Sequence, residues 1–180
     1  MARDPSAGPA TDPDFDPAAH AGGPPRWFED LAIGERFPIP SRTLTAAHFS
    51  AFQAACGDNH PIHYDVAYCR AHGHPDLLAH GYQVLILGAA GAGRFPFEIG
   101  DALIAFLSQD SRFLAPVYAG DTLYPMLELV EKTARRSTGT VTLALTIRNQ
   151  HGTICLEGRQ TYLLRRDPGA VAREGADPAR

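Results

Sequence analysis

The residues in this sequence best suited to chemistry lie in one short stretch, GDNHPIHYD, at residues 57–65. It brings Asp58, His60 and His63 together around Pro61, directly after the apolar run FSAFQAAC. Asp and His are the usual pair for moving a proton near neutral pH, but both also bind metals and both are common in turns. The stretch alone therefore leaves acid–base catalysis, metal binding and a plain turn open.

Three further histidines, His72, His74 and His80, raise the possibility of a metal site, because a His-x-His pair can chelate. No carboxylate follows them at a recognised ligand spacing, and HGHPD is typical of a loop. We therefore predict no metal. We expect His80 to line a pocket or to pack at the start of the following helix.

Composition excludes several functional classes. The 180 residues suit one domain of ordinary size, and 44% hydrophobic residues are enough for a sizeable core. A net charge of −4 argues against a nucleic-acid partner, which would require a basic face. The three cysteines are widely spaced without a C-x-x-C, so neither a disulfide framework nor a thiolate zinc site is expected. No secretory signal and no run long enough to span a bilayer is seen, so we expect no membrane partner and a cytoplasmic location.

The chain divides into three parts by composition. Residues 1–26 hold six of the fifteen prolines with many Ala, Gly and Asp, which predicts a disordered or loosely docked arm. Residues 166–180 have a similar composition and predict a flexible tail. The folded domain should therefore run over residues 27–165.

Periodicity predicts two helices in the first half of this domain. Residues 46–56 have helical apolar spacing, with Thr45 as N-cap and Gly57 as C-terminal stop. Residues 81–93 are apolar or small on every side, which predicts a buried helix despite three glycines. Its GAAGAG follows a helix and lacks a P-loop Lys-Ser/Thr, so we assign the glycines to close packing rather than to nucleotide binding.

From residue 102 onward the period changes to two. Four strands are predicted, joined by short connections that favour antiparallel neighbours, and they cover residues 102–116, 122–132, 140–148 and 153–163. An extended segment lies before the first helix. The layout predicts an α+β domain in which a curved antiparallel sheet wraps around one long buried central helix.

Four collinear segments resemble the MaoC-like dehydratases, also called the (R)-specific enoyl-CoA hydratase family, which has the hotdog fold. GDNHPIHYD is similar to the family signature, roughly G-D-x-[NH]-P-[LI]-H-x-D. The matching segments in chain order are WFEDLAIGERF, GDNHPIHYD, AHGYQVLILG and RFLAPVYAGDTL followed by NQHGTICLEGR. The resemblance covers residues 27–164 and agrees with the layout expected from periodicity.

The resemblance implies reversible hydration of a trans-2-enoyl-CoA to an (R)-3-hydroxyacyl-CoA, with coenzyme A as part of the substrate and no other cofactor. Asp58 and His63 would be the acid–base pair, with Asp58 as the main base, and the N–H of Gly81 would bind the thioester oxygen. The remaining residues expected at the substrate pocket are His60, Pro61, His80 and Tyr82. His60 stands where many members have Asn, which affects its fine role.

Two other functions remain open, namely a hotdog acyl-CoA thioesterase and a catalytically silent acyl-CoA-binding module. Thioesterases usually place a carboxylate or nucleophile near the central helix, and GYQVLILGAAGAG has none. A silent module would be expected to lack Asp58 or His63, and both are present. Because one helix and five or so strands leave a sheet edge exposed, we also expect a homodimer, with a dimer of dimers as a further option.

Overall fold

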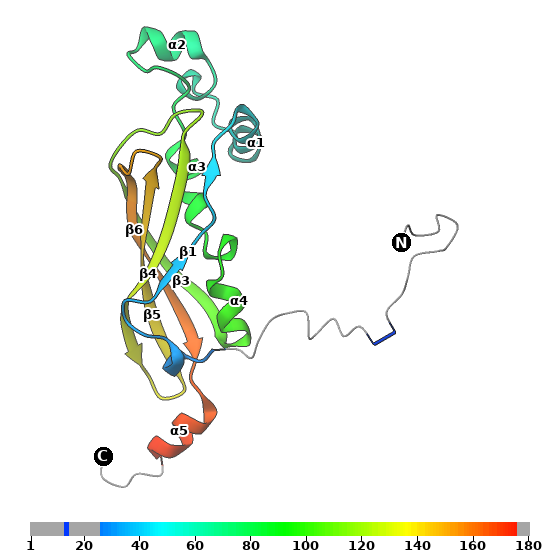
Figure 1. Ribbon diagram of the computed structural model, residues 1–180, viewed down its shortest axis with the longest axis vertical. Helices are drawn as coiled ribbons and strands as arrows, with labels where there is room; N and C mark the ends of the chain where they lie inside the picture. Colours follow the sequence, from blue (N-terminus) through cyan, green and yellow to red (C-terminus); the bar gives the residue numbers. More distant parts are fainter. Residues whose placement is uncertain (1–12, 15–25, 176–180) are drawn as a thin grey trace, which may run out of the picture.

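Alternating apolar and polar residues build one antiparallel sheet of six strands in the part of the chain that this computed structural model describes, residues 13–14 and 26–175 (Figure 1). The strands are β1 (Arg36–Pro38), β2 (Arg42–Thr43), β3 (Leu103–Phe113), β4 (Thr122–Ala134), β5 (Thr138–Asn149) and β6 (Ile154–Arg165). The expected α+β class and curved antiparallel sheet are confirmed.

The strand order is β1-β4-β5-β6-β3, with β2 also pairing with β4. β4, β5 and β6 are neighbours in chain order, as predicted. The prediction that β3 pairs with β4 is wrong, because β3 pairs with β6 at the far edge. The connection over residues 114–121 is not a tight turn, because it runs from β3 at one edge past β6 and β5 to β4. On the way it binds residues 77–79, where the Ala79 N–H donates to the Val117 carbonyl at 2.8 Å.

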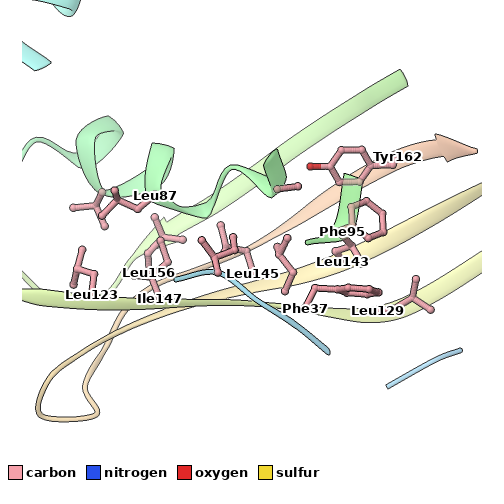
Figure 2. Packing of buried hydrophobic residues seen from close by; sticks show 14 of the residues in the cluster. Phe37, Leu87, Phe95, Leu123, Leu129, Leu143, Leu145, Ile147, Leu156 and Tyr162 are labelled. Atoms are coloured by element: carbon pink, nitrogen blue, oxygen red, sulfur yellow. The ribbon is translucent and has the colours of Figure 1, made fainter. Parts of the chain in front are cut away.

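The inner face of the sheet carries the core. The predicted apolar face of β5 (Val141, Leu143, Leu145 and Ile147) is at most 1% exposed. Figure 2 shows Leu143, Leu145 and Ile147 packed with residues of β4, β6, β1 and the segment between α3 and β3. The labelled members besides Leu143, Leu145 and Ile147 are Phe37, Leu87, Phe95, Leu123, Leu129, Leu156 and Tyr162.

The helical segments lie along that inner face and at the ends of the sheet (Figure 1). They are η2 (Phe28–Asp30), α1 (Ala46–Cys56), η3 (Pro61–His63), α2 (Val66–Ala71), α3 (Gly81–Leu85), η4 (Ile86–Gly88), η5 (Ala90–Ala92), α4 (Phe95–Ile99), η6 (Gly100–Ala102) and α5 (Pro168–Gly175). α1 matches its predicted bounds, with Thr45 as N-cap and Gly57 in the left-handed conformation at φ 72°. None of the described helices is long and apolar enough to cross a membrane.

The predicted long central helix over residues 81–93 is broken into pieces. α3 and η4 run continuously to Gly88, but Ala89 is extended at φ −61° and ψ 123°, and Gly93 is extended as well. The Gly88 carbonyl accepts a hydrogen bond from the Gln160 side chain at 2.8 Å, while the Ala92 N–H donates to Ala89 instead. The sheet therefore takes a carbonyl that a continuous helix would have used.

Two of the central glycines have the close-packing role that was predicted. A Cβ on Gly88 would lie 2.5 Å from a methyl of Leu145, and one on Gly93 would lie 3.0 Å from Ile39 and 3.2 Å from the Pro38 carbonyl. A Cβ on Gly91 would meet nothing within 4 Å. Close packing therefore favours glycine where the segment touches β5 and β1, but not at residue 91.

The central segment is not buried on every side as predicted, because Tyr82 is 65% and Ile86 55% exposed. The neighbouring edge strand is apolar and exposed too. We define the apolar edge face as the β3 side chains that are 40–55% exposed, together with the residue that follows the strand: Ile104, Phe106, Leu107, Phe113 and Leu114. No described strand covers this side of β3, which leaves these side chains exposed.

The predicted arm falls almost entirely outside the described residues. Arg26 is described, and its guanidinium binds Glu35 and Glu98. The predicted flexible tail contains helix α5, tied to the domain by Arg166, which is 7% exposed and binds Glu29 and Glu174. Composition could not predict this helix because its anchor is the set of ion pairs around the buried Arg166 side chain rather than apolar area.

We predict that Gly88→Ala destabilises the protein by about 1–3 kcal/mol, because the new methyl would overlap Leu145 in a filled core. Gly91→Ala is the matched control, and it should be neutral or stabilising by up to about 1 kcal/mol because the space is open and Ala restricts the unfolded chain. Urea unfolding of both variants measures the difference, and equal stabilities would contradict the packing role of Gly88.

Candidate active site

The Asp58 loop begins where α1 ends and is shaped by short-range hydrogen bonds. Asp58 Oδ1 accepts the His60 N–H at 3.0 Å, as expected of an Asx-turn. Pro61 opens η3, where its missing N–H costs nothing, and His60 Nδ1 accepts the Ile62 N–H at 3.3 Å. The loop thereby presents Asp58 and His63 from either side of Pro61.

A second segment, residues 77–80, is bound to this loop. The Leu78 N–H donates to the Ile62 carbonyl at 3.1 Å, and the Leu78 carbonyl lies 2.6 Å from His63 Nδ1. A carbonyl only accepts, so the proton of a neutral His63 is on Nδ1 and Nε2 keeps its lone pair. The imidazole of His63 is thus oriented by the backbone, with one nitrogen free to accept a proton.

His80 connects the second segment to Asp58. Its Nε2 lies 2.7 Å from Asp58 Oδ2, and its Nδ1 accepts the Tyr82 N–H at 3.1 Å. Because the Tyr82 amide can only donate, Nδ1 of His80 must carry the lone pair and Nε2 the proton. His80 therefore donates to Asp58, and both carboxylate oxygens of Asp58 have a donor.

Asp58, His63 and His80 form one compact cluster. A carboxylate oxygen of Asp58 and one ring nitrogen from each histidine lie within 4.8 Å of one another, and the two imidazole centroids are 5.0 Å apart. The side chains of Asp58 and His80 are 36% and 19% exposed, so substrate and water can reach them. The cluster combines an anion, a proton donor and a proton acceptor, which is the equipment of an acid–base site.

The spacing of these ligand atoms would also allow a divalent metal, which the sequence did not predict. The protonation of His80 opposes this use. A metal on Nε2 would require the proton to move to Nδ1, where it would face the Tyr82 N–H. The cluster as hydrogen-bonded here fits proton transfer better than metal ligation.

The hydrogen bonds to Asp58 shift its protonation. The His60 backbone N–H is the largest influence and holds the pKa of the Asp58 carboxyl below its usual range, with partial desolvation acting in the opposite direction. The hydrogen bond from the His80 side chain lowers the pKa of Asp58 further. Asp58 is therefore a carboxylate throughout the neutral range.

Gly81 is the first residue of α3, beside this cluster. No acceptor among the described residues takes its N–H, as expected for the first amide of a helix. A Cβ at residue 81 would lie 3.1 Å from the Phe113 ring, so glycine allows β3 to approach the helix start. The N–H therefore has no protein acceptor in the described part of the chain, and its binding of a thioester oxygen stays a prediction.

The other predicted pocket residues are placed as follows. The His60 ring lies 5.8 Å from the Tyr68 ring and 6.3 Å from the His63 ring, while its backbone N–H holds Asp58. Tyr82 stacks on His80 with centroids 5.7 Å apart and is largely exposed. All seven predicted residues thus lie on the Asp58 loop or at the start of α3.

An apolar groove of about 490 Å³ lies farther along the central segment, between it and strands β3 and β6. Leu85, Ala89, Phe106, Gln160 and Tyr162 are among its lining residues. The Tyr162 hydroxyl donates to Gln160 Oε1, and burial raises the pKa of Tyr162 to about 12. These polar groups are satisfied within the protein, so the groove offers a mainly apolar surface.

Sequence reasoning missed the direct contact between His80 and Asp58, and also the role of Leu78, whose two backbone groups hold the Asp58 loop. For His80 the available signal was its position, one residue before a glycine that opens a helix, where a side chain can accept a backbone N–H. No side-chain pattern could indicate Leu78, because only its backbone is used.

Comparison with known proteins gives the family of this chain. The family model for the MaoC like domain matches residues 30–150. The "Protein MaoC" of Klebsiella aerogenes is 28% identical over 111 residues, covering 61% of this chain and 32% of that protein. The chain therefore belongs to the MaoC-like dehydratase family, although it spans about a third of the length of this curated relative.

Solved structures agree. The monoamine oxidase regulatory protein from Archaeoglobus fulgidus is 32% identical with a TM-score of 0.73, covering 80% of this chain and 97% of that one. The (R)-hydratase PhaJ1 from Pseudomonas aeruginosa is 25% identical with a TM-score of 0.66, covering 78% and 86%. A protein of Mycobacterium tuberculosis described as a double hotdog fold is 26% identical with a TM-score of 0.67, covering 80% and 45%. The hotdog fold predicted from the sequence is confirmed.

We predict that the Asp58 carboxyl titrates below the ordinary value of about 3.9, because two N–H groups stabilise its ionised form. A depressed folded-state pKa adds stability above the unfolded-state value, and this stability is lost as the pH falls through the folded-state value. Carbon-13 NMR titration of the carboxyl measures the midpoint. A midpoint at or above 3.9 would show that these bonds are not kept in solution.

Proposed function

We propose that the protein is a hydro-lyase that reversibly adds water to a trans-2-enoyl-CoA, giving an (R)-3-hydroxyacyl-CoA. The observation that carries the proposal is the placement of the Asp58 carboxylate beside the imidazole of His63 at the start of α3, where the Gly81 N–H is free among the described residues. Membership of a dehydratase family and similarity to a structure named as an (R)-hydratase add support.

In the hydration direction, a water molecule lies between Asp58 and His63. Asp58 and the unprotonated nitrogen of His63 accept hydrogen bonds from it, which raises the electron density on its oxygen. That oxygen forms a bond to C3 of the enoyl group, and the water proton passes to the acid–base pair. A proton from the pair then forms the new bond at C2, so one water is consumed and the pair returns to its starting state.

Negative charge develops on the thioester oxygen while C3 is attacked. The Gly81 N–H would donate to this oxygen, and an amide already fixed by the helix needs little reorganisation as charge builds up. α3 has five residues, so the hydrogen bond from the N–H itself supplies the stabilisation rather than a long helix dipole. No acceptor among the described residues takes that N–H, which supports its use by a ligand oxygen.

The acyl chain would continue into the apolar groove. Leu85 lines the groove and lies four residues after Gly81, or about 6 Å along the helix axis. A thioester held at Gly81 could thus direct its hydrocarbon chain between the central segment and β3. The apolar lining favours an unsubstituted chain over one that carries a second carboxylate.

We expect Asp58→Asn and His63→Gln each to lower kcat for crotonyl-CoA hydration by at least about 100-fold, because each removes a proton-transfer group. The assay follows loss of the conjugated enoyl-thioester absorbance and free thiol in the same cuvette. Loss of absorbance without thiol, abolished in both variants, is the expected result. His151→Gln, in the exposed β5–β6 turn, is the matched control and should retain wild-type activity.

Thiol release from the wild-type protein would identify a thioesterase instead. No change in either signal, with longer apolar enoyl-CoAs also tried, would identify a catalytically silent acyl-CoA-binding module. Unfolding transitions measured for the wild-type protein and for each variant distinguish a folded but inactive protein from a misfolded one.

We also propose a homodimer formed through β3. This strand is eleven residues long, has a single hydrogen-bonded neighbour among the described strands, and carries the apolar edge face. An uncovered apolar edge invites pairing, and a second copy would cover both the edge and the side chains. The groove opens beside the same strand, so its outer wall would then come from the partner.

We predict a dimer at micromolar concentration by sedimentation velocity, and a shift toward monomer on Leu107→Glu, because a buried unpaired charge would oppose association. Leu107 is 51% exposed, so the monomer itself should tolerate the change. Ile33→Glu is the matched control, since Ile33 is 60% exposed and lies outside the apolar edge face. A monomeric wild-type protein would overturn this proposal.

A further inference from the structure

We propose that His80 is a positioning residue for the acid–base pair: its Nε2–H, fixed on that nitrogen by the Tyr82 amide, holds the Asp58 carboxylate in the orientation that faces the water site. The proposal rests on the proposed function, since it concerns the same reaction. It adds a third side chain to the expected pair and gives that side chain a definite protonation state.

The hydrogen bond from Tyr82 determines which ring nitrogen of His80 carries the proton. The Tyr82 N–H donates to His80 Nδ1 at 3.1 Å, and a backbone N–H cannot accept a hydrogen bond. A proton on Nδ1 would therefore place two donors face to face. His80 in this position is a neutral imidazole with its only proton on Nε2, which lies 2.7 Å from Asp58 Oδ2.

His63 is held in the opposite tautomer to His80. Its Nδ1 lies 2.6 Å from the Leu78 carbonyl, which fixes the proton of the neutral ring on that nitrogen and leaves Nε2 as an acceptor. The two imidazoles are 5.0 Å apart but are held in opposite tautomers. His63 can accept a proton on its free nitrogen, whereas His80 can only donate a hydrogen bond through Nε2.

His80 helps to fix the orientation of the Asp58 carboxylate. Its loop lies on the surface and its side chain is 36% exposed, so the carboxylate needs external contacts to keep one rotamer. The His60 N–H fixes Oδ1 from within the loop, at 3.0 Å. His80 fixes Oδ2 from the other segment, and the remaining lone pairs are left for water.

Several ionisable groups face Asp58. His63 follows it on η3, His80 precedes α3, and Cys56 comes from the end of α1, where its Sγ accepts the Asp58 N–H at 3.4 Å. Tyr64 also faces this site, and burial raises the pKa of its hydroxyl, so it is neutral here. Among these groups only His80 donates directly to the Asp58 side chain in the structure.

His80→Asn separates this role from helix capping. The Asn side chain is a good N-cap and can still accept the Tyr82 N–H, but it is too short to donate to Asp58. We expect only a small fall in melting temperature, because Asn keeps the helix cap, and a loss of roughly 10- to 100-fold in kcat on crotonyl-CoA, because a hydrogen bond to a charged group is removed. KM should change less than threefold, because the hydrogen bond that is lost joins His80 to Asp58 within the protein.

The matched control is His48→Asn. His48 Nδ1 likewise accepts a backbone N–H at the start of a helix, that of Thr45 at 3.0 Å, but it lies on the first turn of α1 without a contact to Asp58 among the described residues. It should retain wild-type kcat. A His80→Asn protein with wild-type kcat, or with kcat lost only as its melting temperature falls, would reduce His80 to a cap and overturn the proposal.

Two NMR measurements test the protonation of His80 and its hydrogen bond to Asp58 without an activity assay. In the wild-type protein, long-range proton–nitrogen spectra should show His80 with an unprotonated Nδ1, and the peak is assigned by its loss in His80→Asn. The Asp58 carboxyl should titrate at higher pH in His80→Asn than in the wild type, because a donor to its ionised form is gone. An Nδ1-protonated His80 or an unmoved Asp58 titration would overturn the proposal. If the wild type does not hydrate enoyl-CoAs, the proposed function fails while these spectra still test His80.

Discussion

The site depends on the backbone of a single residue, Leu78. Its N–H and carbonyl bind the Asp58 loop at Ile62 and His63, and thereby join two segments that the chain separates by fifteen residues. The contact fixes the ring of His63, and it brings His80 close enough to reach Asp58. Because backbone groups carry it, the geometry of the acid–base cluster is set by the fold rather than by the flexible side chains that form it.

Leu78 is itself held by the crossing connection between β3 and β4. Its neighbours Leu77 and Ala79 exchange hydrogen bonds with Ala119 and Val117. The connection is long because β3 lies at the far edge of the sheet beside β6, not beside β4. The strand order that departs from the simplest meander thus supplies the support on which residues 77–80 rest.

The break in the central segment after Gly88 shapes the apolar groove beside β3. Gly88 lies against Leu145 and gives its carbonyl to Gln160, which ends the regular helix after about two turns. The chain beyond it follows the sheet in short pieces and leaves an apolar groove beside β3. A helix continued through residue 93 would have used the Gly88 carbonyl for the Ala92 N–H, which donates to Ala89 instead.

The sequence by itself determined the local structure: α1 with its cap at Thr45 and stop at Gly57, the four long strands and the inward face of β5. It also indicated the hotdog fold and the stretch that holds Asp58 and His63. These features follow from periodicity, capping and a short motif, which depend on near neighbours. Only the tertiary structure decided the place of β3, the break at Ala89, the anchoring of α5 by Arg166, and the pairing of His80 with Asp58. Each of these depends on a contact between distant segments, and no local pattern specifies which distant group will accept or donate a given hydrogen bond.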